Sequence, residues 1–370
     1  MSHNPHSNRG REEFLDAARG AAMLFVLLSH FGTAYFSRGE ADRFWEAVLI
    51  RVGMIASPTF TIVSGLVLGY LLSTTGTRFG EIRMKLIDRS LFLLTIGHLL
   101  IAGALWKNSE LISFMRTDCI AVSVIIGALI VQRTSALTRL MLGVLIYVLS
   151  WVAISVWTPA SAAGSVVERV AFGAFDVDNF PLIPWFSLYI GSTAFGQWLA
   201  KLEQAEVRRV AVNLAKLSIA CVGLAGLFEL VKHAEDWELI QHPFLRHLMW
   251  VGQKYPPGPV YLLLYGGIGL AILATSMLAH STGRSRSLRL LAATGQCAFF
   301  IYVIHFYLFD ALYLFKVHPA SAWPLFFLAS CLVIGVVADR WQRRNGNRWL
   351  TVGLPWIASY RQRLTTVEST

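Results

Sequence analysis

Long apolar stretches constrain the fold of this chain more than any other feature of its sequence. Each runs for roughly 16 to 28 residues, and about 20 apolar residues suffice for a helix to cross about 30 Å of hydrocarbon. They lack the alternation of a membrane β-strand. With 55% hydrophobic and 15% charged residues, the chain is predicted to be an all-α, polytopic membrane protein. We expect about ten transmembrane helices, over residues 14–36, 48–72, 91–106, 118–131, 138–157, 181–200, 212–231, 257–279, 288–315 and 323–338.

The basic residues indicate how the predicted helices are oriented. A net charge of +10 is also typical of nucleic-acid-binding proteins, but here Lys and Arg mark topology. About two thirds of them flank the same alternate ends of the spans, which the positive-inside rule assigns to the cytoplasm. We therefore expect no nucleic-acid partner and two cytoplasmic termini. The expected parts are an N-tail over 1–13, a membrane domain over 14–340 and a basic C-tail over 341–370.

The cysteines and the first apolar stretch exclude two other interpretations. Each of the four cysteines lies in or beside an apolar stretch, and none has CxxC or metal-site spacing, so we expect neither disulfides nor a metal site. The first apolar stretch is longer than the core of a signal peptide and lacks a small-x-small cleavage site. We therefore interpret it as the first transmembrane helix.

Two ionisable residues in this first helix are the strongest functional candidates. Arg19 and His30 lie eleven positions apart, close to three turns of an α-helix, so they share a face with His30 about 16 Å further along. Ionisable side chains within hydrocarbon are costly and usually functional. The pair suits a reaction in which Arg19 grips the phosphates of an anionic cytosolic donor and His30 acts as a base. The structural alternative is that Arg19 reaches the interface beside Asp16 and His30 bonds a neighbouring helix.

Several motifs, taken in order, resemble those of a known group of membrane enzymes. Residues 14–20 (Phe-Leu-Asp-Ala-Ala-Arg-Gly), followed by His30, resemble the Arg-x10-His signature that opens the membrane acyltransferase superfamily, and 56–65 resembles its second span. The most similar branch is the one related to heparan-α-glucosaminide N-acetyltransferase. That resemblance lies in residues 116–118, 180–186, 254–257 and 299–307.

The resemblance implies an activity and two residue roles. Members transfer an acyl group, usually acetyl, from cytosolic acyl-CoA to a hydroxyl or amine presented at or across the membrane. The resemblance also implies acetyl-CoA or another acyl-CoA as co-substrate, and no metal. Within this chain it implies that His30 is the catalytic histidine and that Arg19 lies near the CoA-binding end. The chain departs from its relatives after Asp118, where it reads Cys-Ile-Ala-Val in place of a more polar stretch. It also shows no esterase-like domain, so we expect the membrane domain itself to handle a carbohydrate or lipid-linked acceptor.

Further candidates each have a structural alternative. Arg89 is the closest to the third predicted helix of four basic residues that could offset the roughly four negative charges of CoA, or that simply follow the positive-inside rule; the others are Arg78, Arg83 and Lys85. His305 shares a helical face with Tyr302 and is a second catalytic candidate, or else a packed histidine. His98 carries no motif, and we expect a structural role for it.

Three residues are candidates for binding the acceptor. Lys254 and Tyr255 precede a run of prolines that ends one segment and starts the eighth predicted helix, and this rigid turn could aim them at an acceptor. The alternative is an ordinary interfacial Lys and Tyr at a helix start. Trp185 lies between Pro184 and Phe186 near the start of the sixth predicted helix, where it could shape an outer vestibule.

The sequence therefore favours a transmembrane acyltransferase dependent on acyl-CoA, with membrane lipids, acyl-CoA and a carbohydrate or lipid-linked acceptor as its partners. The alternative is a polytopic transporter of an anionic or lipid-linked sugar, although no paired repeats typical of transporters are visible. We expect an integral membrane protein of a bacterial inner membrane. The acceptor, the length of the acyl chain, the choice between direct transfer and an acyl-histidine intermediate, and the oligomeric state stay open.

Overall fold

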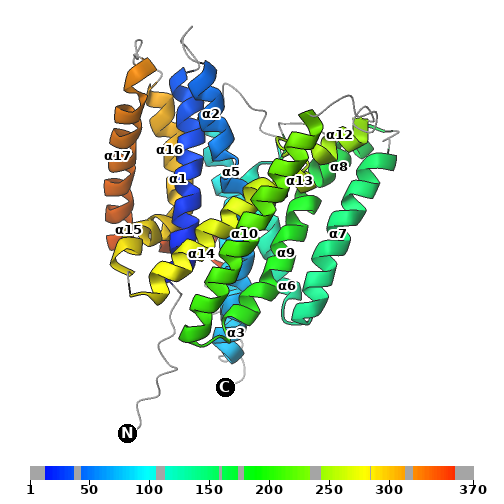
Figure 1. Ribbon diagram of the computed structural model, residues 1–370. Coiled ribbons are helices and arrows are strands. Elements are labelled where there is room, and N and C mark those ends of the chain that lie inside the picture. The colour runs from blue at the N-terminus through cyan, green and yellow to red at the C-terminus, as the bar shows by residue number, and fades with distance from the viewer. Residues whose placement is uncertain are drawn as a thin grey trace. The chain divides into compact units, whose positions relative to one another are not determined.

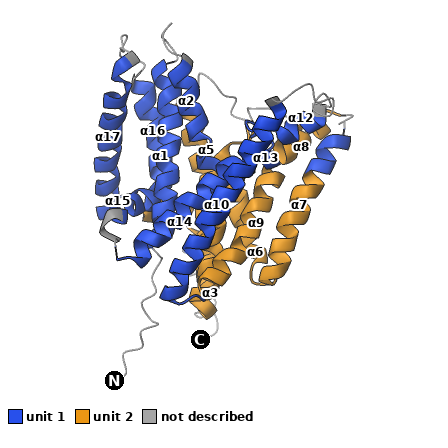
Figure 2. Cartoon of the chain, in the orientation of Figure 1, with its two compact units in different colours: residues 1–63, 151–158, 201–344 blue, residues 64–150, 159–200, 345–370 orange. Residues whose placement is uncertain are grey.

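The computed structural model describes residues 13–36, 43–105, 113–157, 161–173, 179–233, 243–283, 285–312 and 320–354. Within these residues the regular elements are all helices, as the long apolar stretches predict (Figure 1). The chain divides into two compact units (Figure 2). Unit 1 comprises residues 1–63, 151–158 and 201–344, and unit 2 comprises residues 64–150, 159–200 and 345–370.

Unit 1 is built around its first helix. Helix α1 packs against α2, α14, α15 and α16, and it lies beside α16 in Figure 1. Its elements are α1 (Glu13–Phe36), α2 (Arg43–Gly53), the start of α3 (Ala56–Thr75), the end of α7 (Ala136–Val156), α10 (Gln204–His233), α12 (Pro243–Met249), α13 (Pro259–Tyr261), the π-helical turn η3 (Leu262–Gly266), α14 (Gly267–Ser281), α15 (Ser285–Gln296), α16 (Ala298–Leu312), η4 (Ala320–Ala322) and α17 (Trp323–Arg343).

Unit 2 contains the remaining helices. Helix α6 packs against α4, α9 and a π-helical turn that interrupts the third predicted span. The elements are the rest of α3, η1 (Gly76–Arg78), α4 (Phe79–Phe92), the π-helical turn η2 (Leu93–Gly97), α5 (His98–Ala104), α6 (Arg116–Ile130), most of α7, α8 (Ala162–Phe172), α9 (Leu182–Leu199) and η5 (Gly346–Trp349).

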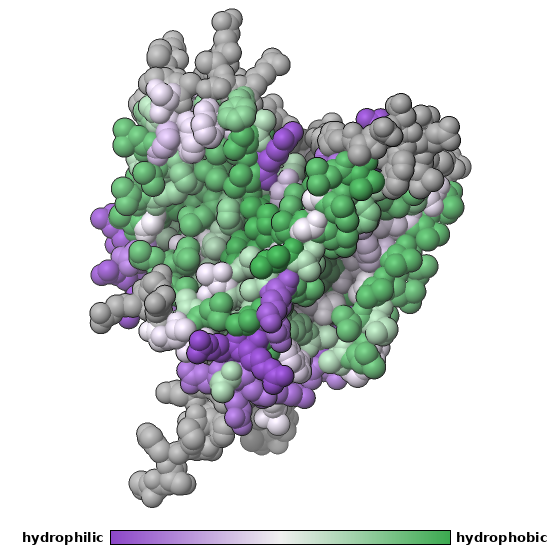
Figure 3. Space-filling model, viewed as in Figure 1, coloured by the Kyte–Doolittle hydropathy of each residue, from purple (hydrophilic) through white to green (hydrophobic). Residues whose placement is uncertain are grey.

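Membrane-spanning helices are present, as predicted. By length and composition, six helical stretches among the described residues can cross a membrane, or seven when a bent pair is counted as one span. Helix α6 has 15 residues and extends only about 22 Å, less than the roughly 30 Å of a hydrocarbon core. Helices α7, α10 and α17 expose large apolar side chains, including Val144, Ile219 and Leu332. Figure 3 shows apolar surface over these helices, as expected of helices in contact with lipid.

The predicted span over 288–315 is not one straight helix. The chain turns at Cys297, and the segments on its two sides are bent by 82°. Helix α15, before the bend, mixes basic and apolar residues and packs along α1, whereas α16 is almost wholly apolar. The predicted span is therefore either one broken span or a separate helix followed by a span. Apolar content alone did not reveal that this segment is a separate amphipathic helix.

Two glycines allow α1 and α15 to cross closely. A side chain at Gly20 would overlap the carbonyl oxygen of Leu291, and one at Gly295 would overlap that of Asp16. Small residues let helix backbones approach each other in this way. The contact fixes α15 against the part of α1 that carries Asp16 and Arg19.

We expect Gly20→Ala to destabilise the protein by about 1–3 kcal/mol, because the added methyl group meets backbone rather than a flexible side chain. Gly335→Ala is a matched control, since no described atom outside its own helix lies within 4 Å of the added Cβ. In this control, the exchange of glycine for alanine within a helix should stabilise the protein by about 0.5–1 kcal/mol. Thermal unfolding of the purified variants in detergent measures both effects. Equal stability of the two variants would contradict the close crossing.

In unit 2, glycines and a buried arginine hold neighbouring helices together. Gly65 and Gly69, one turn apart on α3, lie against the backbone of Tyr189 and Thr193 on α9. Arg139 is completely buried. Its guanidinium donates hydrogen bonds to the backbone oxygens of Val131, at 2.7 Å, and Thr134, at 2.9 Å, and to the side chain of Gln197. These donors satisfy the carbonyl group of the residue that caps the C-terminal end of α6 and one in the turn that follows it.

Candidate active site

The two predicted catalytic histidines lie side by side in unit 1. His30 on α1 and His305 on α16 have ring centroids 5.1 Å apart in an edge-on arrangement. Phe306 lies against both rings, with centroids 4.9 Å from His30 and 4.2 Å from His305. Tyr302, predicted to share the face of His305, is 5.4 Å from it. The sequence did not predict that these residues meet, because 275 positions separate the two histidines.

The backbone of α16 fixes the tautomer of His305. Its Nδ1 lies 3.2 Å from the carbonyl oxygen of Ile301. A carbonyl oxygen only accepts hydrogen bonds, so Nδ1 must carry the proton and donate it. In the neutral ring the lone pair is therefore on Nε2, the nitrogen that can act as a base. His305 is fully buried and His30 is half-buried, which makes His30 the more accessible of the two.

Arg19 belongs to a polar network at the other end of α1. Its guanidinium lies 3.7 Å from the carboxylate of Asp16, which is fully buried. Gln296 at the end of α15 donates to Asp16 at 3.1 Å, and Gln342 on α17 donates to Gln296. The side chain of Arg19 keeps 17% of its surface exposed. Asp16 therefore orients the guanidinium while leaving part of it accessible to an anion.

The two polar sites on α1, at Asp16 and Arg19 and at His30, each contact one helix of the bent pair α15 and α16. Asp16, which holds Arg19, meets Gln296 on α15, and His30 meets His305 on α16. This is consistent with the shared face predicted from the eleven-residue spacing. The arrangement provides a cation at one end of a helix and two imidazoles about 16 Å further along. Chemically, it can bind an anionic group and exchange protons with a second group.

The other predicted site residues are spread over both units. Arg89 is exposed on α4 of unit 2, next to the buried Asp88, which accepts hydrogen bonds from the hydroxyl of Thr351 and the amide of Leu354. Trp185, also in unit 2, is 1% exposed and stacks on Phe180 with centroids 5.0 Å apart. Its indole thus serves the packing of this unit, and an acceptor-binding role for it stays a prediction.

Lys254 and Tyr255 lie in a tight turn of unit 1, as the prolines predict. The ammonium of Lys254 sits over the ring of Tyr255, 5.1 Å from its centroid. Gln253 stabilises the turn, since its amide nitrogen donates to the carbonyl oxygen of Tyr255 at 2.8 Å and its amide oxygen lies 2.9 Å from Nδ1 of His247. The side chains of Lys254 and Tyr255 are half-buried. Binding of the acceptor by Lys254 and Tyr255 stays a prediction.

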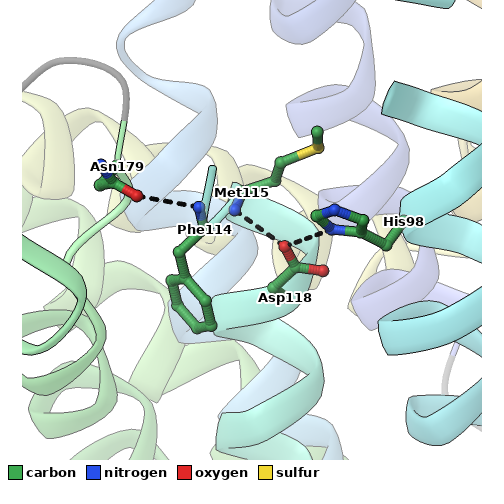
Figure 4. A network of polar contacts seen from close by, with 5 residues as sticks. All are labelled: His98, Phe114, Met115, Asp118 and Asn179. Atoms are coloured by element: carbon green, nitrogen blue, oxygen red, sulfur yellow. Dashed lines mark hydrogen bonds and ion pairs between the residues drawn. The ribbon is translucent and has the colours of Figure 1, made fainter. Parts of the chain in front are cut away.

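Sequence reasoning missed one pair in unit 2. Nδ1 of His98 lies 2.8 Å from Oδ2 of Asp118 (Figure 4). The same carboxylate oxygen accepts the backbone N–H of Met115, also at 2.8 Å. The only local signal was the position of Asp118 at the start of a predicted helix, where acidic residues are common caps. His98, for which we expected a purely structural role, is thus one half of a histidine–carboxylate pair.

The helices and these polar clusters define the protein as a polytopic α-helical membrane protein with ionisable groups held in its interior. Residues 11–231, more than half of the chain, match the catalytic domain model of heparan-α-glucosaminide N-acetyltransferase. The chain therefore belongs to this family of membrane acetyltransferases, which confirms the resemblance found in the sequence. The match contains Arg19, His30 and the His98–Asp118 pair but ends before Lys254 and His305. No curated protein and no solved structure matches the chain.

Proposed function

We propose that this protein transfers an acyl group, expected to be acetyl, from cytosolic acyl-CoA to a hydroxyl or amine of a carbohydrate or lipid-linked acceptor. The family supports acetyl transfer in a membrane. The observation that carries the proposal is the contact of His30 with His305 of α16, at 5.1 Å between ring centroids, together with Arg19 on the same helix as His30. A base and an anion-binding group on one helix are the two parts that thioester chemistry with CoA requires.

In the proposed reaction, Arg19 binds a phosphate of CoA, and the thioester reaches the level of His30. His30 takes the proton of the attacking hydroxyl or amine as this group adds to the thioester carbonyl carbon. The carbon–sulfur bond then breaks, and the proton passes to the CoA thiolate. His305, with its proton fixed on Nδ1 by Ile301, packs against His30 and limits how its ring can turn. Arg89 is proposed to add positive charge for CoA.

Lys254, Tyr255 and Trp185 are proposed to contact the acceptor. The proposed topology has ten spans and two cytoplasmic termini, with an N-tail over 1–13, a membrane domain over 14–340 and a C-tail over 341–370, in a bacterial inner membrane. The described residues contain no cluster of three or more His, Cys, Asp or Glu side chains able to hold a metal ion, and every step above is assigned to protein side chains.

Acetyl transfer to an amino sugar tests the proposed function. The family description names a glucosaminide as the acetyl acceptor, so glucosamine and methyl glucosaminide are the first probes. Purified protein in lipid nanodiscs is incubated with labelled acetyl-CoA and each probe, and labelled sugar and free CoA are measured. We expect both products in equal amounts. Movement of the sugar across a vesicle membrane without release of CoA would support the transporter alternative.

Arg19→Gln is expected to raise the KM for acetyl-CoA at least tenfold with little change in kcat, because the substitution removes a charge-assisted contact with phosphate that is remote from the reacting bond. Arg209→Gln, which removes a basic residue from α10, is the control and should leave the KM unchanged. Steady-state rates over a range of acetyl-CoA concentrations separate the two parameters. An unchanged KM for Arg19→Gln would remove Arg19 from the donor site.

A further inference from the structure

Helix α15 is turned away from the direction of the helices that cross the membrane. It meets α16 at an angle of 82°, and α16 runs beside α1 (Figure 1). The 12 residues of α15 extend about 18 Å, but at this angle they add almost nothing to the depth of α16. Helix α1 is long and apolar enough to span a membrane. In a membrane that α1 crosses, α15 therefore lies close to the membrane plane.

Contacts with α1 and α17 fix the depth of α15 in such a membrane. The carbonyl oxygen of Asp16, in the first turn of α1, lies against Gly295 of α15. Gln342, near the end of α17, donates a hydrogen bond to the side chain of Gln296. Helix α17 is also long and apolar enough to cross a membrane. Helix α15 thus lies at the level where α1 begins and α17 ends, which is the level of the lipid headgroups beside the hydrocarbon core.

The two faces of α15 differ in their surroundings. Leu288 and Ala292, one turn apart, are buried and pack with Ala17 of α1. Away from this face, Arg289 is exposed, and Leu290 beside it keeps 81% of its surface exposed. Basic and large apolar side chains that are exposed together are typical of a helix that lies in the membrane interface.

The charge of this segment is positive and lacks compensation within the segment. Residues 281–296 include no acidic side chain, and their arginines lie at positions 284, 286 and 289. Among the described residues no carboxylate pairs with Arg289, whereas Arg343 of α17 pairs with Asp339 at 2.8 Å. The positive charge of Arg289 therefore complements an anion that comes from outside the protein.

An anionic phospholipid matches both exposed side chains of this face. Its phosphate can accept hydrogen bonds from the guanidinium of Arg289, and its acyl chains can cover the side chain of Leu290. A small soluble anion would satisfy the arginine but would leave the leucine in water. The position of α15 at the headgroup level brings both parts of a lipid within reach.

We propose that α15 is an interfacial helix that binds an anionic phospholipid. In the proposed site, Arg289 binds the headgroup phosphate, and Leu290 inserts between the acyl chains. Binding needs neither acyl-CoA nor an acyl acceptor, so the site stands or falls independently of the proposed function. Because Gln296 at the end of α15 donates to Asp16, a lipid that holds α15 in place also supports the start of α1.

The first experiment measures the lipid preference of the purified protein by native mass spectrometry. Phosphatidylglycerol is the anionic probe, and phosphatidylcholine, which also has a phosphate but no net charge, is the neutral one. We expect the wild type to retain phosphatidylglycerol more strongly. Arg289→Gln should lower this preference about fivefold, the usual contribution of one basic residue at an anionic surface. Arg289→Lys keeps the charge and should retain most of the preference.

Arg209→Gln is the control for this experiment. Arg209 is also exposed, but it lies on α10, a helix that can cross the membrane and has the acidic Glu206 in its first turn. Its loss removes the same charge without touching α15. The lipid preference of Arg209→Gln should therefore equal that of the wild type. An equal loss of preference in Arg209→Gln and Arg289→Gln would overturn the site, because the preference would then follow total charge.

The second experiment measures hydrogen exchange of the α15 amides in nanodiscs of phosphatidylcholine with and without phosphatidylglycerol. We expect slower exchange in α15 when the anionic lipid is present, and no such difference in Arg289→Gln. Leu290→Gln should speed the exchange of α15 by about threefold or more in both lipids, since the inserted side chain is lost. Thermal unfolding shows that each variant is folded. Equal retention of the two lipids by the wild type, or exchange in α15 that ignores both the lipid and Leu290→Gln, would overturn the proposal.

Discussion

His30→Ala is expected to lower kcat for acetyl transfer by about 10²- to 10⁴-fold while the protein stays folded. The reason is the proposed role of the imidazole as general base, which typically contributes this factor. His30 is half-buried and packs against His305 and Phe306 without filling the fully buried core, so its loss should affect the reaction far more than the fold. Release of CoA from acetyl-CoA in the presence of an amino sugar measures the effect.

The control for this variant is His280→Ala. His280 is another histidine of unit 1, at the end of α14, where its ring lies 5.6 Å from that of Phe14. It has no place in the proposed reaction, so its substitution should change kcat less than about twofold, the level expected for a residue that makes no contact in the transition state. If His30→Ala retained the wild-type rate, or if both variants lost activity equally with unchanged folding, His30 would not be the base.

Arg139→Met is expected to destabilise the protein by several kcal/mol. The guanidinium is completely buried and donates hydrogen bonds to the carbonyl oxygens of Val131 and Thr134 and to the side chain of Gln197. Methionine fills much of the same volume but donates nothing, and each buried acceptor left without a donor costs about 1–3 kcal/mol. Loss of folded protein during thermal unfolding in detergent is the measurement.

Arg133→Met provides the control, because Arg133 lies in the turn just before α7, the helix that carries Arg139, but is exposed. We expect the free energy of unfolding of the Arg133→Met variant to stay within about 0.5 kcal/mol of the wild-type value, as is usual for surface substitutions. Arg139→Lys should recover part of the loss, since one ammonium cannot reach all three acceptors at once. A stability of Arg139→Met equal to that of the Arg133 control would contradict the buried network.

The sequence predicted the helices well where their apolar length alone decides the structure. The stretches predicted at 14–36, 138–157 and 181–200 appear as α1, α7 and α9 with ends that agree within a few residues. The sequence did not predict the bend within 288–315, where an amphipathic helix and an apolar helix follow each other with only Cys297 between them. Before the 82° bend, α15 packs along α1, and this packing depends on residues distant in sequence.

The candidate site was predictable in its members but not in its contacts. The spacing of Arg19 and His30 followed from helical geometry, and the partner of Arg19, Asp16, was visible one turn away. The meeting of His30 with His305, and that of His98 with Asp118, join residues on different helices. No local pattern encodes such pairs, because tertiary packing creates them. His98 in particular lacked any motif that would have separated it from a packed histidine.

The most direct test of the central claim is a cryo-electron microscopy map of the protein with a thioether analogue of acetyl-CoA that cannot transfer its acyl group. The account predicts that a phosphate of the analogue contacts the guanidinium of Arg19 and that its acyl end lies within hydrogen-bonding reach of the His30 ring, along one face of α1. An analogue bound away from α1, with lipid or sealed protein packing around both side chains, would contradict it.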